Sequence, residues 1–175
     1  MKPAPVDPML LRRSLGSFVT GVTIMTTCTA GGELVGLTVN SFNAVSLSPP
    51  LVLWSLSLRA ASYEAFMQAS HFAVNVLAAD QRALSDRFAR TGGDKFNGLS
   101  WREGMDGLPL FDGTAATFIC RNTARHPGGD HVIFIGEVLA HDTSGRPPLA
   151  YANGRYVTMC EASQADLSRE REELS

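Results

Sequence analysis

Charged residues are few in this sequence, and long hydrophobic runs are lacking. Only 18% of the 175 residues are Asp, Glu, Lys or Arg, and the formal net charge is −2 at pH 7. Because nucleic acid is bound by strongly positive surfaces, this composition predicts no nucleic-acid partner. No apolar stretch approaches the roughly 18 residues that a transmembrane helix requires, and residues 1–7 lack the apolar segment of a signal peptide. We therefore expect a cytoplasmic protein without a membrane partner.

Cysteine, histidine and nucleotide-binding motifs are also sparse. Cys28, Cys120 and Cys160 are odd in number and far apart, which disfavours a disulfide framework and a zinc site and favours reduced thiols. The four histidines are scattered, so no metal site is predicted. The glycine pairs at 31–32 and 92–93 do not complete a dinucleotide fingerprint or a phosphate loop. An enzyme that uses a nicotinamide on this chain must therefore bind it without a Rossmann unit.

The remaining composition is that of an ordinary globular protein. Hydrophobic residues make up 45% of the chain, which is long enough for one domain with a well-buried core. We predict a single domain over 1–175, with its core at about 10–157 and a charged, helix-prone tail at 163–175.

Strands dominate the predicted secondary structure, because β-branched and alternating apolar residues recur in short runs. The turn-forming residues 30–32 indicate that the first two strands form a hairpin. A loop at 126–131 is predicted between the two long strands that precede and follow it. The second strand of the hairpin ends in the polar segment described below. The other predicted strands are 19–29, 51–56, 71–77, 115–125, 132–141 and a short last segment within 149–159.

Three short helices are predicted around these strands. One begins at Asp7, with Pro8 in its first turn, a second covers 62–70, and a third is capped by Asp80. Residues 90–112 are rich in glycine and predict a long loop, which is usually functional or ordered by a ligand. Because strands and helices do not alternate regularly, we expect a closed or nearly closed antiparallel barrel, mainly β with inserted helices.

The most informative segment is 36–53, where a cluster of small polar side chains lies between two apolar strands. None of these side chains titrates near neutral pH, so the segment can hold a ligand only by hydrogen bonds, which is typical of a cofactor that supplies its own chemistry. A hydrogen-bonded strand end and turn is the alternative interpretation. The polar residues are Thr38, Asn40, Ser41, Asn43, Ser46 and Ser48.

Two further positions could bind a ligand. Lys95, together with Ser62 at a predicted helix start, is a candidate phosphate anchor, because a cation and a helix N-terminus both favour an anion. His131 follows Gly129 and Asp130, and the carboxylate of Asp130 could orient the imidazole. Taken singly, the lysine could also be a solvated loop residue and the histidine a structural one.

Together these segments resemble the short-chain flavin reductase family, the small reductase components that feed two-component flavin monooxygenases. The resemblance runs in consistent order over about 10–156. Its most specific parts are the Asn-Ser-Phe to Pro-Pro block and the Gly-Asp-His element. The matching segments are 15–23, 36–53, 72–77 with Gln81, Leu84 and Phe88, then 94–98, 128–131 and 149–156.

The resemblance implies a split β-barrel of the FMN-binding type with Greek-key antiparallel topology. It also implies a homodimer that binds FMN or FAD in a groove near the dimer interface. The implied activity is that of an NAD(P)H-dependent flavin reductase, with NADH the expected donor, which passes reduced flavin to a partner monooxygenase.

The resemblance also implies roles for individual residues. The flavin ring and ribityl chain should contact the polar segment and the strand after it, and the phosphate should contact Ser62 and Lys95. His131 should be the catalytic residue, as a donor that positions the nicotinamide. The flavin-binding set is Thr38, Val39, Asn40, Ser41, Ser46, Ser55, Leu56, Ser57, Ser62, Lys95 and Phe96, and the nicotinamide-binding set is Gly129, Asp130, His131, Tyr151, Arg155 and Tyr156.

Three alternatives remain open at this stage. A protein of the same fold could carry flavin without reducing it rapidly. A pyridoxine-phosphate oxidase-like enzyme would share the fold, but it would need several basic residues for the substrate phosphate. An interaction module that binds no flavin is the third.

Overall fold

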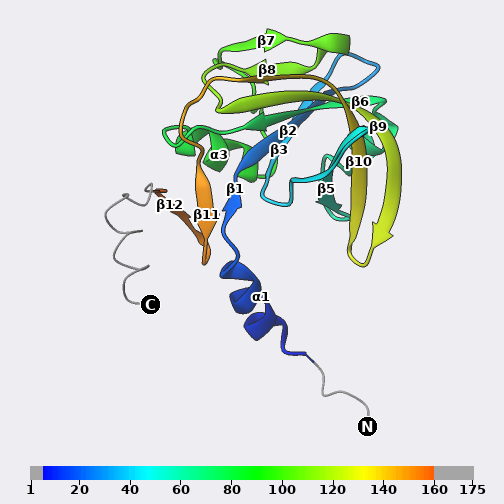
Figure 1. Ribbon diagram of the computed structural model, residues 1–175. Coiled ribbons are helices and arrows are strands. Elements are labelled where there is room, and N and C mark those ends of the chain that lie inside the picture. Colours follow the sequence, from blue (N-terminus) through cyan, green and yellow to red (C-terminus); the bar gives the residue numbers. More distant parts are fainter. Residues whose placement is uncertain (1–5, 160–175) are drawn as a thin grey trace.

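The computed structural model describes residues 6–159 and is built from antiparallel strands with few helices (Figure 1). This architecture confirms the predicted fold class. Cys160 and the tail at 163–175 lie outside the described residues.

One large sheet forms the body of the molecule. Its seven strands have the order β3-β2-β6-β9-β10-β5-β4, and every neighbouring pair is antiparallel. The hairpins β2–β3, β4–β5 and β9–β10 join sequence neighbours, whereas β6 and β9 bring together distant segments. The strands are β2 (Thr23–Cys28), β3 (Leu34–Val39), β4 (Asn43–Leu47), β5 (Pro50–Ser57), β6 (His71–Val76), β9 (Ala116–Gly128) and β10 (His131–Thr143).

The large sheet curls around a single aromatic cluster. Trp54 on β5 contacts Phe66, Phe72 and Phe134 with ring centroids 5.0, 5.8 and 4.7 Å away, and all four side chains are buried. Met25, from β2 at the other side of the sheet order, joins the same cluster. Strands that are far apart in the sheet order therefore face each other across one core. The pattern on β5, where every second residue is buried, follows from this arrangement.

Two small sheets complete the fold. β1 (Thr20–Gly21), β11 (Ala150–Ala152) and β12 (Arg155–Val157) form one of them, and β7 (Trp101–Glu103) and β8 (Pro109–Phe111) form the other. The prediction of 90–112 as a loop throughout was wrong, because β7, β8 and a short 3₁₀ turn at Met105–Gly107 lie within it. β7 and β8 pair with each other, with Trp101 opposite Phe111 and Glu103 opposite Pro109.

The helices lie close to their predicted positions. They are α1 (Pro8–Gly16), α2 (Tyr63–Gln68) and α3 (Arg82–Ala89). Asp7 caps α1 by accepting hydrogen bonds from the backbone N–H groups of Met9 and Leu10, as predicted. The N-cap of α3 is Gln81 rather than Asp80, because Asp80 pairs with Arg146 at 2.5 Å.

The predicted loop at 126–131 is instead the tip of a long hairpin. β9 and β10 are 13 residues each, Gly128 pairs with His131, and only Gly129 and Asp130 turn the chain. Gly129 has φ of +71°, which favours glycine. The hairpin holds His131 at the end of a strand. Within 6–159, no helix is both long and apolar enough to span a membrane.

Candidate functional site

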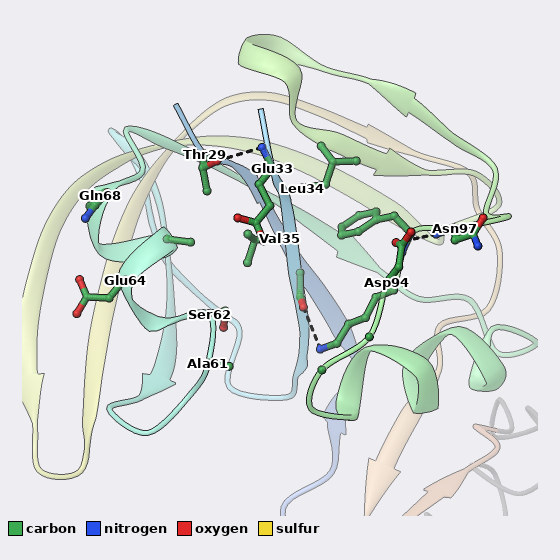
Figure 2. A pocket seen from close by; sticks show the side chains of 16 residues that line it. Thr29, Glu33, Leu34, Val35, Ala61, Ser62, Glu64, Gln68, Asp94 and Asn97 are labelled. Carbon is green, nitrogen blue, oxygen red and sulfur yellow. Dashed lines mark hydrogen bonds between the residues drawn. The ribbon is translucent and has the colours of Figure 1, made fainter. Parts of the chain in front are cut away.

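The exposed edge of β3 forms the floor of a large groove. β3 ends the order of the large sheet and pairs only with β2, so its outer peptide groups have no neighbouring strand. The groove has a volume of about 890 Å³. Figure 2 shows Ser62 and Glu64 on the α2 side, Asp94 on the opposite side, and Val35 of β3 between them.

Gly36 allows aromatic side chains to pack directly against this strand. A Cβ atom at Gly36 would lie 2.8 Å from the ring of Phe88 and 3.3 Å from the ring of Phe96. Those two rings pack edge to face with centroids 5.1 Å apart. Glycine at this position therefore fixes one wall of the groove.

Lys95 lies across the middle of the groove. Its Nζ donates to the carbonyl oxygens of Gly36, at 3.4 Å, and Phe88, at 3.2 Å. Partial burial lowers the pKa of Lys95 from its ordinary value of 10.5. Two carbonyl dipoles are weak partners for a cation in such a place. The lysine can therefore exchange them for an anion that enters the groove.

Ser62 lies across the groove from this lysine, but the helix behind it is short. α2 has only six residues, and the Ser62 side chain makes no capping hydrogen bond. The predicted contribution of a helix N-terminus to anion binding is thus small, because the dipole of such a short helix is small. Ser62 contributes its hydroxyl, and Lys95 contributes the charge.

A smaller cavity of about 200 Å³ lies at the other end of β3. A chain of hydrogen bonds crosses this region: the Thr38 hydroxyl donates to the carbonyl of Ser85 at 2.7 Å, and the Ser85 and Tyr156 hydroxyls are 2.9 Å apart. Tyr156 also donates to Asp86 at 2.8 Å. Burial is the main cause that raises the pKa of Tyr156, so this phenol stays protonated. The cavity is lined by Val22, Thr38, Val39, Asn40, Ser85, Ala89, Tyr151 and Tyr156.

The chain that follows β3 connects this region to β5. The Ser41 hydroxyl accepts from the backbone N–H of Ser55 at 2.9 Å and donates to its carbonyl at 3.1 Å. Further along β5, Ser57 pairs with His131 in the sheet register. The predicted flavin contacts on β5 and the Gly-Asp-His element at the start of β10 therefore lie on neighbouring strands.

His131 and Asp130 form an exposed pair at the hairpin tip. His131 Nδ1 lies 2.7 Å from a carboxylate oxygen of Asp130. This hydrogen bond is the main cause that lowers the pKa of Asp130. The carbonyl of Asp130 accepts from the backbone N–H of Leu58 at 3.0 Å, which ties the tip to the end of β5. The imidazole is thus oriented by its neighbour while its other nitrogen stays available.

Three of the predicted residues lie apart from these groups. Leu56 is buried in the core, so it can contact a ligand only through its backbone. Ser46 lies on β4, where its hydroxyl accepts from the N–H of Ser48 near the hairpin turn. Arg155 lines a separate groove of about 710 Å³ that also includes Arg12 and Arg13 of α1. Their predicted contacts with flavin or nicotinamide remain predictions.

Several groove residues have no signal in the sequence. Thr29, Glu33, Glu64 and Gln68 line the large groove, and Ser85 links Thr38 to Tyr156. These positions have ordinary polar residues with no motif. The β2–β3 turn brings Thr29 and Glu33 to the groove, α2 brings Glu64 and Gln68 to its other side, and α3, which packs on β3, brings Ser85 beside Thr38.

This arrangement fits a long, flat, anionic ligand with a polar edge. An open strand edge offers peptide donors and acceptors, and the hydroxyl and amide groups after it offer more. Lys95 offers a cation beside Gly36, and Ser62 offers a hydroxyl across the groove from it. The groups of a flavin, a ring edge, a polyol chain and a phosphate, match these three features in that order along the strand.

Comparisons with known proteins identify the family of this chain. Residues 15–159 match the family model described as flavin reductase like domain. FMN reductase (NADH) SmoA of Agrobacterium fabrum is 47% identical over 145 residues, which is 83% of this chain and 82% of the relative. The reductase component of a flavin-dependent trigonelline monooxygenase of Acinetobacter baylyi is 42% identical over 153 residues, which is 87% of this chain. This chain spans about half the length of that relative and of a probable flavin reductase of Rhizobium meliloti.

A solved structure supports the same relationship. The NADH:FAD oxidoreductase SgcE6 of Streptomyces globisporus C-1027, in complex with NAD and FAD fragments, superposes with a TM-score of 0.85 at 36% identity. The match covers 93% of this chain and 100% of that one.

Proposed function

This chain belongs to the flavin reductase like domain family, and on that premise we propose that it reduces FMN or FAD with NADH. The observation that carries the proposal is the groove along the open edge of β3, with Lys95 and Ser62 beside Gly36 and polar residues of the 38–41 segment at its other end. The reaction is a hydride transfer from the nicotinamide to the flavin.

The bound flavin would supply the hydride acceptor, so the protein needs no strong acid or base. The residues of this chain position the reactants instead. Lys95 and Ser62 hold the phosphate by a charge-assisted and a neutral hydrogen bond. Asn40 and Ser41, with the outer peptide groups of β3, hold the polar edge of the ring and the ribityl chain. Donors aimed at the ring edge also stabilise negative charge that develops there during reduction.

The nicotinamide is assigned to the hairpin-tip side. His131 has one ring nitrogen held by Asp130, so the imidazole has a fixed orientation from which it contacts the nicotinamide. Tyr151 and Tyr156 pack edge to face with centroids 5.5 Å apart and supply an aromatic surface near Asn40. Holding both rings in a fixed orientation is the main contribution of the protein to the rate. NADH is the proposed donor because relatives are named for NADH and NAD.

A flavin-dependent monooxygenase is the proposed recipient of the reduced flavin. The support is the name of the Acinetobacter baylyi relative, a reductase component of such an enzyme.

A homodimer is the proposed assembly, and α1 supports it. None of the residues of α1 is buried, and Figure 1 shows the helix projecting away from the sheets. Its apolar side chains and those just after it are exposed, with values of 61% for Leu10, 65% for Leu15 and 70% for Phe18. This exposed apolar surface supports an interface there, and a second copy of the chain is the commonest partner.

The activity is tested by steady-state oxidation of NADH and NADPH with FMN and with FAD, followed at the absorbance of the reduced nucleotide. We expect flavin-dependent turnover that is faster with NADH. A mixture of the same flavin and nucleotide without protein gives the background rate. No turnover above that background with either flavin would overturn the proposal.

A further inference from the structure

We propose that Asp86 is a positioning residue for the nicotinamide, because its carboxylate fixes the orientation of the Tyr156 ring. This inference rests on the proposed function, in which Tyr156 supplies part of the aromatic surface that contacts the nicotinamide. Asp86 lies on α3, and it does not line the small cavity beside Asn40. Its effect on a ligand in that cavity is therefore indirect, through the tyrosine.

The two oxygens of the Asp86 carboxylate have different partners. One oxygen accepts from the Tyr156 hydroxyl at 2.8 Å, and the other lies 3.6 Å from Nε of Arg82, one turn earlier on α3. The guanidinium of Arg82 also lies over the Tyr156 ring, with its Cζ atom 5.1 Å from the ring centroid. Two side chains of α3 thus contact the hydroxyl and the face of the same tyrosine.

Counting donors fixes the direction of the hydrogen bonds at Tyr156. A phenol has one proton and a carboxylate can only accept, so Tyr156 donates to Asp86. The Ser85 hydroxyl, 2.9 Å from the Tyr156 oxygen, must then donate to it. Ser85 is fully buried, so this bond is shielded from water. The Tyr156 hydroxyl has no proton left for a ligand, and the residue acts through its ring.

The same contacts tie the tyrosine to the strand beside the proposed flavin site. The Thr38 hydroxyl donates to the carbonyl of Ser85 at 2.7 Å, so hydrogen bonds connect β12 through α3 to the end of β3. Asn40 follows that strand end and lines the same cavity as Tyr156. The ring is therefore held relative to the residues that contact the flavin, as hydride transfer between two rings requires.

The strand that carries Tyr156 constrains it only weakly. β12 has three residues and lies at the edge of its small sheet, and Tyr156 is half-buried. The hydroxyl partners thus decide where the ring lies. Arg82 and Asp86 are 69% and 46% exposed, and exposed ion pairs add little to stability. Removing the Asp86 carboxylate should therefore release the ring without unfolding the protein.

The test compares the wild type, Asp86→Ala, Tyr156→Phe and the double variant at saturating flavin. Calorimetric titration measures the affinity for NAD⁺, and steady-state kinetics measure KM for NADH and kcat. Each single variant should weaken NAD⁺ binding and raise KM by about three- to tenfold, the scale of one hydrogen bond. Both kcat and flavin affinity should stay within about twofold, because the ring contacts the nicotinamide equally before and during transfer.

Two further comparisons isolate the hydrogen bond. The double variant should be no worse than either single variant, because Asp86 acts through the Tyr156 hydroxyl. Asp86→Asn keeps an acceptor oxygen and should restore most of the loss. Asp142→Ala removes an exposed carboxylate on β10 outside the site, and as the matched control it should change none of these quantities.

The outcomes separate this inference from the proposed function. Unchanged NAD⁺ affinity and KM in Asp86→Ala, additive losses in the double variant, or equal losses in Asp86→Asn and Asp86→Ala would each overturn the positioning role and leave the reductase assignment intact. Absence of flavin-dependent NADH oxidation by the wild type would contradict the proposed function, and this inference with it.

Discussion

Lys95 and His131 have separate structural surroundings, which makes their roles separable by substitution. Lys95 contacts the middle of β3, whereas His131 lies at a hairpin tip beside Ser57 of β5. The first is near the proposed phosphate, and the second is near the proposed nicotinamide.

Replacing Lys95 by alanine should weaken flavin binding by about 1–3 kcal/mol, the scale of one charge-assisted hydrogen bond. The rate of reduction at saturating flavin should change little. Flavin titration of the two proteins measures the difference. Lys95→Arg is the matched control, because it keeps a cation at this position. Unchanged affinity in Lys95→Ala would show that the phosphate lies elsewhere.

The lowered pKa of Lys95 predicts a pH dependence of flavin affinity. A lysine is cationic below its pKa, so a lowered pKa means that the charge is lost at a pH below the ordinary value of 10.5. Affinity should therefore fall as the pH rises through this lowered pKa. The Lys95→Arg protein should not show this fall, because arginine remains charged throughout. Identical profiles for both proteins would assign the titration to the ligand instead.

Replacing His131 by alanine should slow hydride transfer and leave flavin affinity nearly unchanged. The side chain is exposed and held by Asp130, so its removal costs the core nothing. Single-turnover reduction and flavin titration of the same variant separate the two effects. Loss of flavin affinity with a normal reduction rate would remove His131 from the nicotinamide site and leave Tyr151 and Tyr156 as its remaining proposed contacts.

At the scale of elements, one buried asparagine connects the β7–β8 segment to the large sheet. The amide nitrogen of Asn75 donates to the carbonyl of Ile24 at 3.2 Å, to the hydroxyl of Thr26 at 3.2 Å and to the carbonyl of Pro109 at 3.4 Å. Its carbonyl accepts from the N–H of Phe111 at 2.8 Å. Asn75 itself is fully buried.

Replacing Asn75 by alanine should lower the free energy of unfolding by about 2–4 kcal/mol, because buried polar groups on β8 lose their partner. Urea denaturation measures this loss. Asn43→Ala, an exposed position on β4, is the control and should change stability by less than about 0.5 kcal/mol. A loss in Asn75→Ala no larger than in the control would show that the segment is held by other contacts.

The sequence predicted most helices and strands but not all of the strand pairings. The helix capped by Asp7 and the strands β2, β5 and β6 were predicted because local periodicity and capping determine them. At 126–131 the sequence predicts a loop, because glycine and proline there mask a continuous pairing that only the partner strand reveals. β7 and β8 were missed because each has only three residues, too few for a periodic pattern, and glycines lie between them.

The residues of the candidate site also divide into those that the sequence identifies and those that only the packing reveals. Lys95, Ser62 and the polar segment could be selected from residue type and resemblance. Glu33 and Gln68 could not, because they become part of one groove only when α2 packs beside the edge of β3.

At the scale of the whole molecule, the exposed apolar helix α1 predicts a dimer that depends on it. Substituting Leu10 and Leu15 together by aspartate should shift the protein from dimer to monomer, measured by light scattering at micromolar concentration. Val45 and Leu47 on β4 are also exposed, at 47% and 94%, and their paired substitution by aspartate is the control. A monomeric wild type, or a dimer that survives the α1 substitutions, would contradict this assignment of the interface.

The most direct test of the account is anaerobic mixing of the flavin-loaded protein with NADH, followed by the absorbance of oxidised flavin. We expect rapid bleaching by one equivalent of NADH. Bleaching should be slower when deuterium replaces the transferred hydrogen on nicotinamide C4, since the protein brings that hydrogen directly to the flavin. Flavin that binds the protein but bleaches no faster than free flavin with NADH would contradict hydride transfer at this site.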